Sequence, residues 1–585
     1  MASRLTTYIV VLIVAGTLIA GLIVGAQRDD ADGPVDLIIT NGRVYTGDPG
    51  RTAEALAVRG NKILRVGSNR EIKRLRRPQT TMIDAHGASV LPGFNDAHAH
   101  LLSGGLSLGN VNLLGSTTLE AIQTTIGAFA ASHPERAWIS GRGWYYEPFP
   151  GGLPTRQQLD AVVPDRPAYL TAYDGHTGWA NTKALQLAGI TRRTPDPPNG
   201  VIVKDPSTGE PTGVLKEAAQ ALVRTVMPPP SHEGRLAALR SAVREAQRVG
   251  VTSVHDAGGT VADLEIFDEL RQQGELQLRV YAAVSVGPEF TNDDLIRLDA
   301  IRERYPDDPL FKTGAIKIMA DGVVEAHTAA MLAPYANRVS TGQPTHATGD
   351  LSRIVTMLDR RSWQVIVHAI GDAAVRDALD AFEHAATANP VPARGRRHRI
   401  EHVETLDPAD VPRFGSLGVI ASFQPFHGSP APNQIDVWAA NLGPVRASRG
   451  WSYGSIHAAA GRLAFGSDWP VVTLDPRFGL HTAVTRTTPD GLPEGGWHPR
   501  ERVPLATAID AYTSAGAWAS FDEQRKGTIE REMLADLVIL SSDIFAPGAR
   551  LLDTTVETTI FDGKVVYSRD PGVELTDNSR LSYNH

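Results

Sequence analysis

The middle of the chain alternates short apolar runs with amphipathic helical stretches, as a parallel sheet covered by helices requires. Eight such runs are found, at residues 91–100, 252–256, 279–285, 315–321, 364–370, 398–402, 419–424 and 463–468. Eight strand–helix units are typical of a closed (β/α)8, or TIM-type, barrel within an α/β fold. Two further strand-like runs, 137–141 and 168–172, precede the second unit and are assigned to an insertion at about 105–245.

The two ends of the chain have a different pattern, with short β-branched runs separated by Gly, Asn and Asp turns. They cover residues 37–44, 55–66 and 81–90 near the start, and 537–540 and 559–567 near the end. The last run contains Asp562-Gly563, which is typical of a hairpin. We therefore predict one β-sandwich domain built from both termini, residues 36–90 and 523–585, around a barrel domain at 91–522.

Residues 1–35 are predicted to form a transmembrane helix and a linker. No charge occurs from Leu5 to Gln27, and at about 1.5 Å per residue this run can cross a bilayer core of roughly 30 Å. Its positive side is the amino end, so the catalytic domain should lie on the extracytoplasmic side. A cleaved signal peptide, which would release a secreted protein, is the alternative. Gly21 and Gly25 would allow two anchors to pack as a homodimer.

The composition restricts the partners, nucleophiles and metal ligands that this protein can use. The 585 residues are 42% hydrophobic and 21% charged, as in globular proteins. A net charge of -8 without a dense Lys/Arg stripe argues against a nucleic-acid partner. The chain has no cysteine, which excludes disulfides, thiolate ligands and a cysteine nucleophile. A metal site would therefore need His, Asp, Glu or a modified residue.

Ligand-type residues occur where predicted barrel strands end. His98 and His100 are two apart on the first strand and share a face. His368, His402 and Asp468 each close a later apolar strand. The carboxyl ends of barrel strands converge on the catalytic face, so the joint pattern predicts a divalent-metal site. A single histidine of this kind would more often be an ordinary core residue.

Three other polar residues near these strand ends have two interpretations each. Asp372 and Glu401 either orient neighbouring imidazoles or act as simple caps. Lys317 lies in a strand expected to be buried, where an unpaired ammonium is costly. It either pairs with Asp321 or reacts with carbon dioxide to give a carbamate that bridges two metals.

With these residues in place, the sequence resembles the amidohydrolase superfamily, specifically the amidohydrolase-3 group related to N-substituted formamide deformylases. The resemblance spans about residues 36–570. It rests on the segments LPGFNDAHAH (91–100), YDGHTGWAN (173–181), KIMADG (317–322), HAIGD (368–372), RIEH (399–402), GSDWP (466–470) and LADLV (534–538).

The resemblance implies a barrel with a β-sandwich and one or two divalent ions, with zinc expected. His98 and His100 would bind the first ion with Asp468, while His368 and His402 would bind the second. A carboxylated Lys317 would bridge them. The implied reaction is hydrolysis of a non-peptide carbon–nitrogen bond, amide, N-acyl or N-formyl, in a small molecule.

In that reaction metal-activated hydroxide would attack the carbonyl, and Asp468 would accept the water's proton and pass it to the leaving nitrogen. Trp144 and His176, in the insertion, are expected to line the substrate pocket, with ordinary packing or capping as the alternative. Gly141-Arg-Gly-Trp144 is followed by Tyr145, where related members often have an acidic residue. That difference puts a shared substrate contact there in doubt.

Two other functions remain open from the sequence. The same hydroxide would attack an ester or lactone, and a barrel that binds metal can serve as a non-catalytic sensor. A serine hydrolase is disfavoured because Gly466-Ser467-Asp468 is not a Gly-x-Ser-x-Gly nucleophile elbow.

Overall fold

The structure is a computed structural model that describes residues 35–47 and 53–571. The predicted membrane anchor at 1–35 therefore lies outside the described residues, apart from residue 35. Within the described part of the chain, no helix combines the length and the apolar character needed to cross a bilayer.

Eight parallel strands form the centre of the molecule, as predicted. They are β7 (Phe94–Ala99), β14 (Val251–Gly259), β15 (Arg279–Val286), β16 (Phe311–Met319), β17 (Gln364–Ala369), β18 (Arg399–His402), β19 (Ile420–Phe423) and β20 (Arg462–Phe465). They pair in that order. The chain after β20 meets β7, because Asp468 N–H donates to the His98 carbonyl at 2.6 Å and His100 N–H donates to the Trp469 carbonyl at 2.7 Å. The result is a nearly closed barrel.

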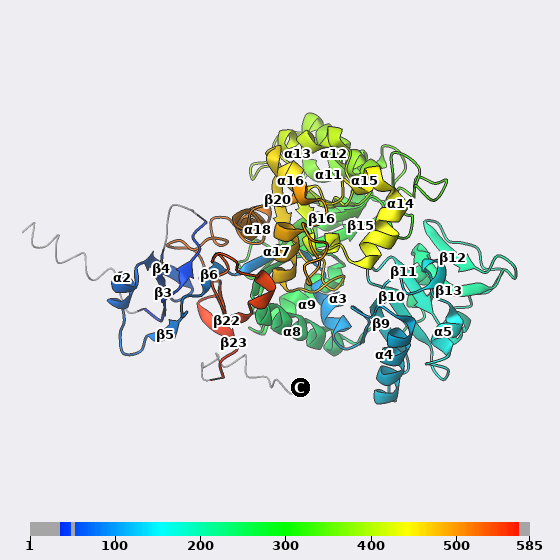
Figure 1. The fold of residues 1–585 in the computed structure, drawn as a ribbon. Helices are drawn as coiled ribbons and strands as arrows, with labels where there is room; N and C mark the ends of the chain where they lie inside the picture. The colour runs from blue at the N-terminus through cyan, green and yellow to red at the C-terminus, as the bar shows by residue number, and fades with distance from the viewer. Residues whose placement is uncertain (1–34, 48–52, 572–585) are drawn as a thin grey trace, which may run out of the picture.

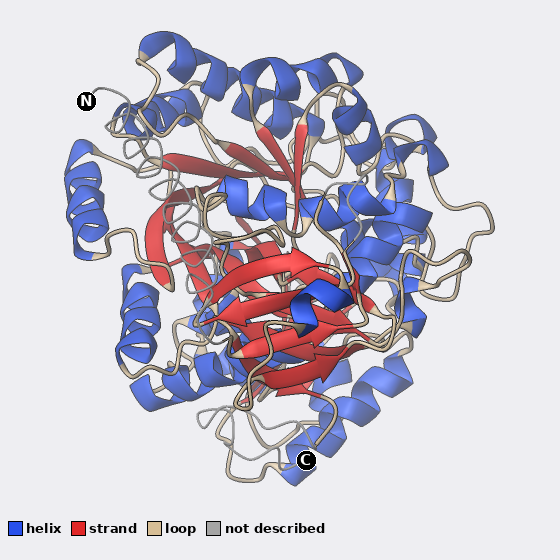
Figure 2. Ribbon diagram, turned by 90° about the vertical axis from the view of Figure 1, so that its left-hand side faces the viewer, coloured by secondary structure: helices blue, strands red, loops and turns tan. Residues whose placement is uncertain are grey.

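Helices surround these strands, and their apolar faces pack against the sheet (Figure 2). The longer ones are α8 (His232–Arg248), α9 (Val261–Gln272), α10 (Asn292–Arg304), α11 (Asp350–Arg360), α12 (Asp372–Ala388) and α17 (Pro476–Thr485). In α11 the buried Leu351, Ile354, Val355 and Leu358 recur at helical spacing and form one face.

Strands from both termini share one sheet beside the barrel. The five-stranded sheet is β2 (Arg43–Val44), β6 (Ser89–Pro92), β21 (Leu537–Leu540), β22 (Val556–Phe561) and β23 (Lys564–Ser568), and β6 pairs antiparallel with β21. A four-stranded sheet adjoins it, formed by β4 (Lys62–Gly67), β3 (Ala55–Arg59), β1 (Leu37–Thr40) and β5 (Thr81–Asp84). One apolar cluster draws residues from both sheets, including Ile39, Leu56, Val90 and Ile539.

Residues between β7 and β14 form a separate six-stranded sheet on the side of the barrel opposite the terminal sheets (Figure 1). Its strands are β12 (Gly200–Lys204), β13 (Pro211–Glu217), β11 (Thr177–Ala180), β10 (Ala168–Ala172), β9 (Ile139–Trp144) and β8 (Val111–Asn112). The two strand-like runs predicted in this region correspond to β9 and β10. The sheet has its own apolar core and carries the loop 173–176 to the mouth of the barrel.

Candidate metal centre

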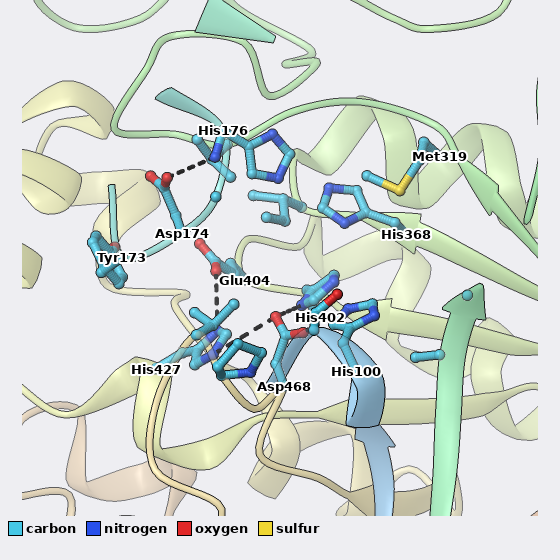
Figure 3. Close-up of a pocket in the computed structure, with 18 of the residues that line it drawn as sticks. His100, Tyr173, Asp174, His176, Met319, His368, His402, Glu404, His427 and Asp468 are labelled. Atoms are coloured by element: carbon cyan, nitrogen blue, oxygen red, sulfur yellow. Dashed lines mark hydrogen bonds and ion pairs between the residues drawn. The ribbon is translucent and has the colours of Figure 1, made fainter. Parts of the chain in front are cut away.

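A cavity of about 440 Å³ opens at the carboxyl ends of the barrel strands (Figure 3). His100, Lys317, His368, His402 and Asp468 line it from the barrel, and the insertion closes part of its wall. This volume is in the range of small-molecule sites, and the position is the catalytic face of such barrels.

The first group of ligand-type atoms joins the first and last barrel strands. Asp468 Oδ1 lies 3.1 Å from His100 Nε2 and 3.4 Å from His98 Nε2. Gly466 makes this approach feasible, because a Cβ there would lie 2.4 Å from the His98 backbone nitrogen. Asp96 ties the same segments together by accepting hydrogen bonds from the His98 and Ser467 backbone N–H groups, each at 3.0 Å.

A second group shares the same aspartate. Asp468 Oδ2 lies 3.9 Å from His402 Nδ1 and 3.9 Å from His427 Nε2. His427 was not predicted from the sequence. It lies in the short turn η4 (Pro425–Gly428) after β19, beyond the strand end where ligands were expected. Its only sequence signal is a histidine four residues past the end of the buried strand β19.

His368 lies beside these groups, with its ring 4.5 Å from that of His402 between centroids. Its Nε2 lies 3.2 Å from the Gly322 carbonyl oxygen, so Nδ1 is the ring nitrogen that this contact does not occupy. Among the described residues, the two sets of ligand atoms close enough to hold one ion contain His98, His100 and Asp468, and His402, His427 and Asp468. His368 is therefore adjacent to the centre but outside both sets.

Lys317 is 4% exposed and lines the cavity. The alternative pairing with Asp321 is not formed. The Asp321 carboxylate instead accepts backbone N–H groups of Ala330, Ile370 and Gly371 at 2.8–3.0 Å. No carboxylate within the described ranges lies in ion-pair distance of the Lys317 ammonium. Burial lowers the pKa of Lys317, which favours the neutral amine that a carbamate requires.

Several buried polar atoms at this centre have no hydrogen-bond partner. They are His98 Nε2, His402 Nδ1, His427 Nε2 and Asp468 Oδ1. Buried polar atoms of this kind are rare unless a ligand or ion completes them. His402 and Asp468 also have backbone φ values of 75° and 59°, which are strained for residues with a side chain and recur at functional sites. Imidazole nitrogens with a carboxylate suit zinc or a similar divalent ion.

Electrostatics keep the carboxylate of this centre ionised. Burial alone would raise the pKa of Asp468, but His98, His100 and His402 outweigh it and hold that pKa well below its usual range. Asp468 is therefore an anion at neutral pH, able to bind a cation or accept a proton.

Glu401 contacts Nδ1 of His98, the ring nitrogen opposite the one that faces Asp468. Its Oε2 lies 2.5 Å from His98 Nδ1, and its Oε1 accepts from Arg399 Nε at 2.8 Å. Of the two interpretations of Glu401, the orienting role fits its contact with the His98 imidazole. Asp372 instead accepts the Leu332 backbone N–H at 2.8 Å, which ties the start of α12 to the segment before α11 and is neither of the two predicted roles.

His176 reaches the cavity from the insertion. Its Nδ1 lies 2.8 Å from Glu217 Oε2, and its ring centroid is 5.6 Å from that of His368. Burial opposes the charged imidazole, but Glu217 and Asp174 raise the pKa of His176 to about 9.

The expectation that Trp144 lines the substrate pocket is wrong. Trp144 is fully buried in the core of the insertion and is absent from the cavity wall, and its indole N–H donates to the Leu170 carbonyl at 3.2 Å. Arg142 lines the cavity instead. Gly143 between them has a φ of +96°, which breaks the usual strand alternation, so residues two apart do not share a face.

Comparison with known proteins identifies the family of this chain. The model of the amidohydrolase family matches residues 81–567. The protein LONG AFTER FAR-RED 3 of Arabidopsis thaliana is 33% identical, over 91% of each chain. The N-substituted formamide deformylase of Arthrobacter pascens is 28% identical, over 91% of this chain and 98% of its own.

A solved structure shows the same architecture. An uncharacterized metal-dependent hydrolase from Pyrococcus horikoshii OT3 is 25% identical and superposes with a TM-score of 0.67, covering 86% of this chain and 97% of its own. Since the family model spans most of the sequence and the buried histidines meet at the catalytic end of the barrel, the chain belongs to the amidohydrolase family and is a hydrolase of the metal-dependent amidohydrolase superfamily.

Proposed function

We propose that this hydrolase cleaves the carbon–nitrogen bond of a small N-acyl or N-formyl compound. The observation that carries the proposal is Asp468, whose two oxygens face two groups of histidines at one cavity. The match to an N-substituted formamide deformylase supports an amide-type bond rather than an ester.

The residues that would hold metal are His98, His100 and Asp468 on one side and His402 and His427 on the other. We propose zinc, with His368 and a carboxylated Lys317 as further ligands. A divalent metal in this position would lower the pKa of a water to near 7 and polarise the substrate carbonyl.

Asp468 would move the proton. It is ionised, is nearly buried, and lies beside the cavity, so it can accept the proton of the attacking water and return it to the leaving nitrogen. His176 would bind the substrate. Because Nδ1 is held by Glu217, its Nε2 is the nitrogen available to donate a hydrogen bond to a substrate oxygen.

We also propose that residues 1–35 anchor the enzyme in a membrane, with the catalytic domain outside the cytoplasm, and that paired anchors would support a homodimer. The proposal rests on the uncharged run and its charge asymmetry.

The reaction is tested on metal-loaded full-length protein with four matched substrate classes: N-formyl amines, N-acyl amines, esters and lactones. Turnover of the first two, lost on metal removal and restored by zinc, is expected. An Asp468→Asn sample with its metal content measured is the control. Turnover of esters or lactones alone would indicate an esterase. Full metal content with no turnover on any acyl compound would indicate a sensor.

A further inference from the structure

One end of the cavity is acidic. Asp174, Glu325 and Glu404 all line it, and Figure 3 shows Asp174 and Glu404 on the same side of the pocket as Tyr173, with His100 on the other side. Glu325 and Glu404 are only 7% and 6% exposed. Glu325 and Glu404 have no role in the proposed hydrolysis, and Asp174 bears on it only through the pKa of His176.

The hydrogen bonds of these carboxyl groups come from neutral donors. The donors are the Tyr173 hydroxyl and Asn433 amide to Glu325, the Trp438 indole to Glu404 at 2.8 Å, and the Tyr146 hydroxyl and His176 backbone N–H to Asp174, each at 2.9 Å. Across the described residues, no Lys or Arg nitrogen lies within 4.0 Å of the three groups. Arg142 lines the same cavity but donates to the Tyr173 carbonyl. Burial raises the pKa of Asp174 and lifts that of Glu325 to about 7, so a further cation bound in the cavity would favour the ionised carboxylates.

A second feature at this end also points to a ligand. Gln434 lines the cavity and is 7% exposed, yet its side-chain amide makes no hydrogen bond to the described residues. It lies in a π-helical segment, Asn433–Ala439, a type of turn that occurs frequently at functional sites. The adjacent Asn433 Oδ1 is buried and also unpartnered. Polar groups this buried are normally satisfied, and here only a cavity occupant can satisfy Gln434.

The chemistry of the wall favours an organic cation over a metal ion. The carboxyl oxygens of Asp174, Glu325 and Glu404 are in neither of the two groups of ligand atoms close enough to hold one metal among the described residues. Tyr173 and Trp451 line the same cavity, and aromatic rings attract ammonium groups.

We propose that Asp174, Glu325, Glu404 and Gln434 form an acidic subsite that binds a protonated amine of the substrate. The inference rests on the proposed hydrolysis and names its substrate class: an N-acyl or N-formyl compound with a second, cationic amine. Gln434 would accept from the ammonium through its carbonyl oxygen, and the carboxylates would supply the charge.

The spacing limits the size of this substrate. A single imidazole separates the acidic subsite from the metal centre, because His427 Nδ1 lies 4.0 Å from Glu404 and its Nε2 lies 3.9 Å from Asp468. The scissile carbonyl and the ammonium must therefore be joined by a short linker within the cavity of about 440 Å³.

The first test measures binding without hydrolysis. Calorimetry on the zinc-loaded full chain compares 1,4-diaminobutane with 1,4-butanediol, which has the same length and no charge. Hydrogen bonds to charged groups contribute about 1.5–3 kcal/mol, so the diamine should bind at least about tenfold more tightly. Glu325→Gln should remove most of that preference. Glu120→Gln, an exposed residue of α4 (Leu119–Ser132), should retain it.

The second test measures turnover of N-acetyl-1,4-diaminobutane against N-butylacetamide, and kcat/KM should favour the cationic amide by at least about tenfold. Diamine binding without turnover of either amide would refute the proposed hydrolysis and leave the acidic subsite supported. Equal affinity of the unmodified protein for the diamine and the diol would overturn the subsite, and this comparison stands even if Glu325→Gln does not fold. An undiminished preference for the diamine in folded Glu325→Gln would also overturn the subsite.

Discussion

Replacing Glu401 by Gln should damage both stability and metal binding. The Glu401 carboxylate is fully buried and accepts from two donors, His98 Nδ1 at 2.5 Å and Arg399 Nε at 2.8 Å. A glutamine has one acceptor oxygen and one amino group, so one of these donors must face another donor. If the amino group faces Arg399, a buried guanidinium loses its carboxylate. If it faces His98, the imidazole must carry its proton on Nε2, the nitrogen that points at Asp468.

Two estimates of the stability lost in Glu401→Gln agree. Removing one partner of a buried ion pair costs about 3–5 kcal/mol. Burial opposes ionisation of Glu401, but Arg399 and His98 outweigh it and lower its pKa from 4.5 to about 2. A difference of this size corresponds to roughly 3 kcal/mol. Because the folded pKa is depressed, this stabilisation is present above about pH 4.5 and is lost as the pH falls toward 2. Loss of an orienting partner also lowers metal affinity about 10–100-fold.

The assay is chemical unfolding of the metal-free protein, with zinc affinity measured by competition against a chelator. Glu523→Gln is the matched control. Glu523 also binds an arginine, Arg397, at 2.7 and 2.9 Å, but its side chain is 30% exposed. It should lose no more than about 1 kcal/mol. If Glu401→Gln behaves like this control in both measurements, Glu401 neither balances Arg399 nor orients His98.

Four other outcomes are expected. Asp468→Asn should lower turnover at least about 10²-fold while the fold persists, and near-normal turnover at normal metal content would remove Asp468 from the mechanism. Lys317→Ala should lose metal and activity, with partial rescue by short carboxylic acids; full retention of both would make Lys317 structural. Mass spectrometry should find residues 1–35 intact in the membrane fraction, whereas a mature terminus at Gln27 would indicate a signal peptide. Trp144→Ala should destabilise the insertion by about 3–5 kcal/mol and leave the KM of folded enzyme within about twofold, which steady-state kinetics can contradict.

Much of the barrel was predictable because its strands are buried on both faces and appear as continuous apolar runs. Boundaries were less predictable. The fourth strand was expected to begin at Ala315, but β16 begins at Phe311, because pairing continues through an irregularity opposite Ala282 and Ala283. In the insertion, β8 has two residues and β13 contains Gly213, so neither produces a clear strand pattern.

The residues of the candidate site also differ in how far the sequence predicted them. His98, His100, His402 and Asp468 were predictable because parallel strands in a barrel bring their carboxyl ends to one rim whatever the separation in sequence. His427 was not, because it is placed by a turn beyond β19. Trp144 was expected in the pocket from its place in the insertion, but Gly143 changes the direction of the strand and Arg142 lines the cavity instead.

The metal centre and the proposed substrate subsite differ in how far a sequence can predict them. Apart from His427, the residues that would hold metal lie at or just after strand ends, which the apolar pattern locates. The residues proposed to select the substrate lie beyond the strands, Glu325 and Glu404 in loops and Gln434 in the π-helical segment. Their positions depend on contacts such as Trp438 with Glu404 that no local pattern encodes. The type of reaction is therefore more readable from this sequence than its substrate. A direct test of substrate charge will accordingly discriminate among members of the family better than a further search for metal ligands.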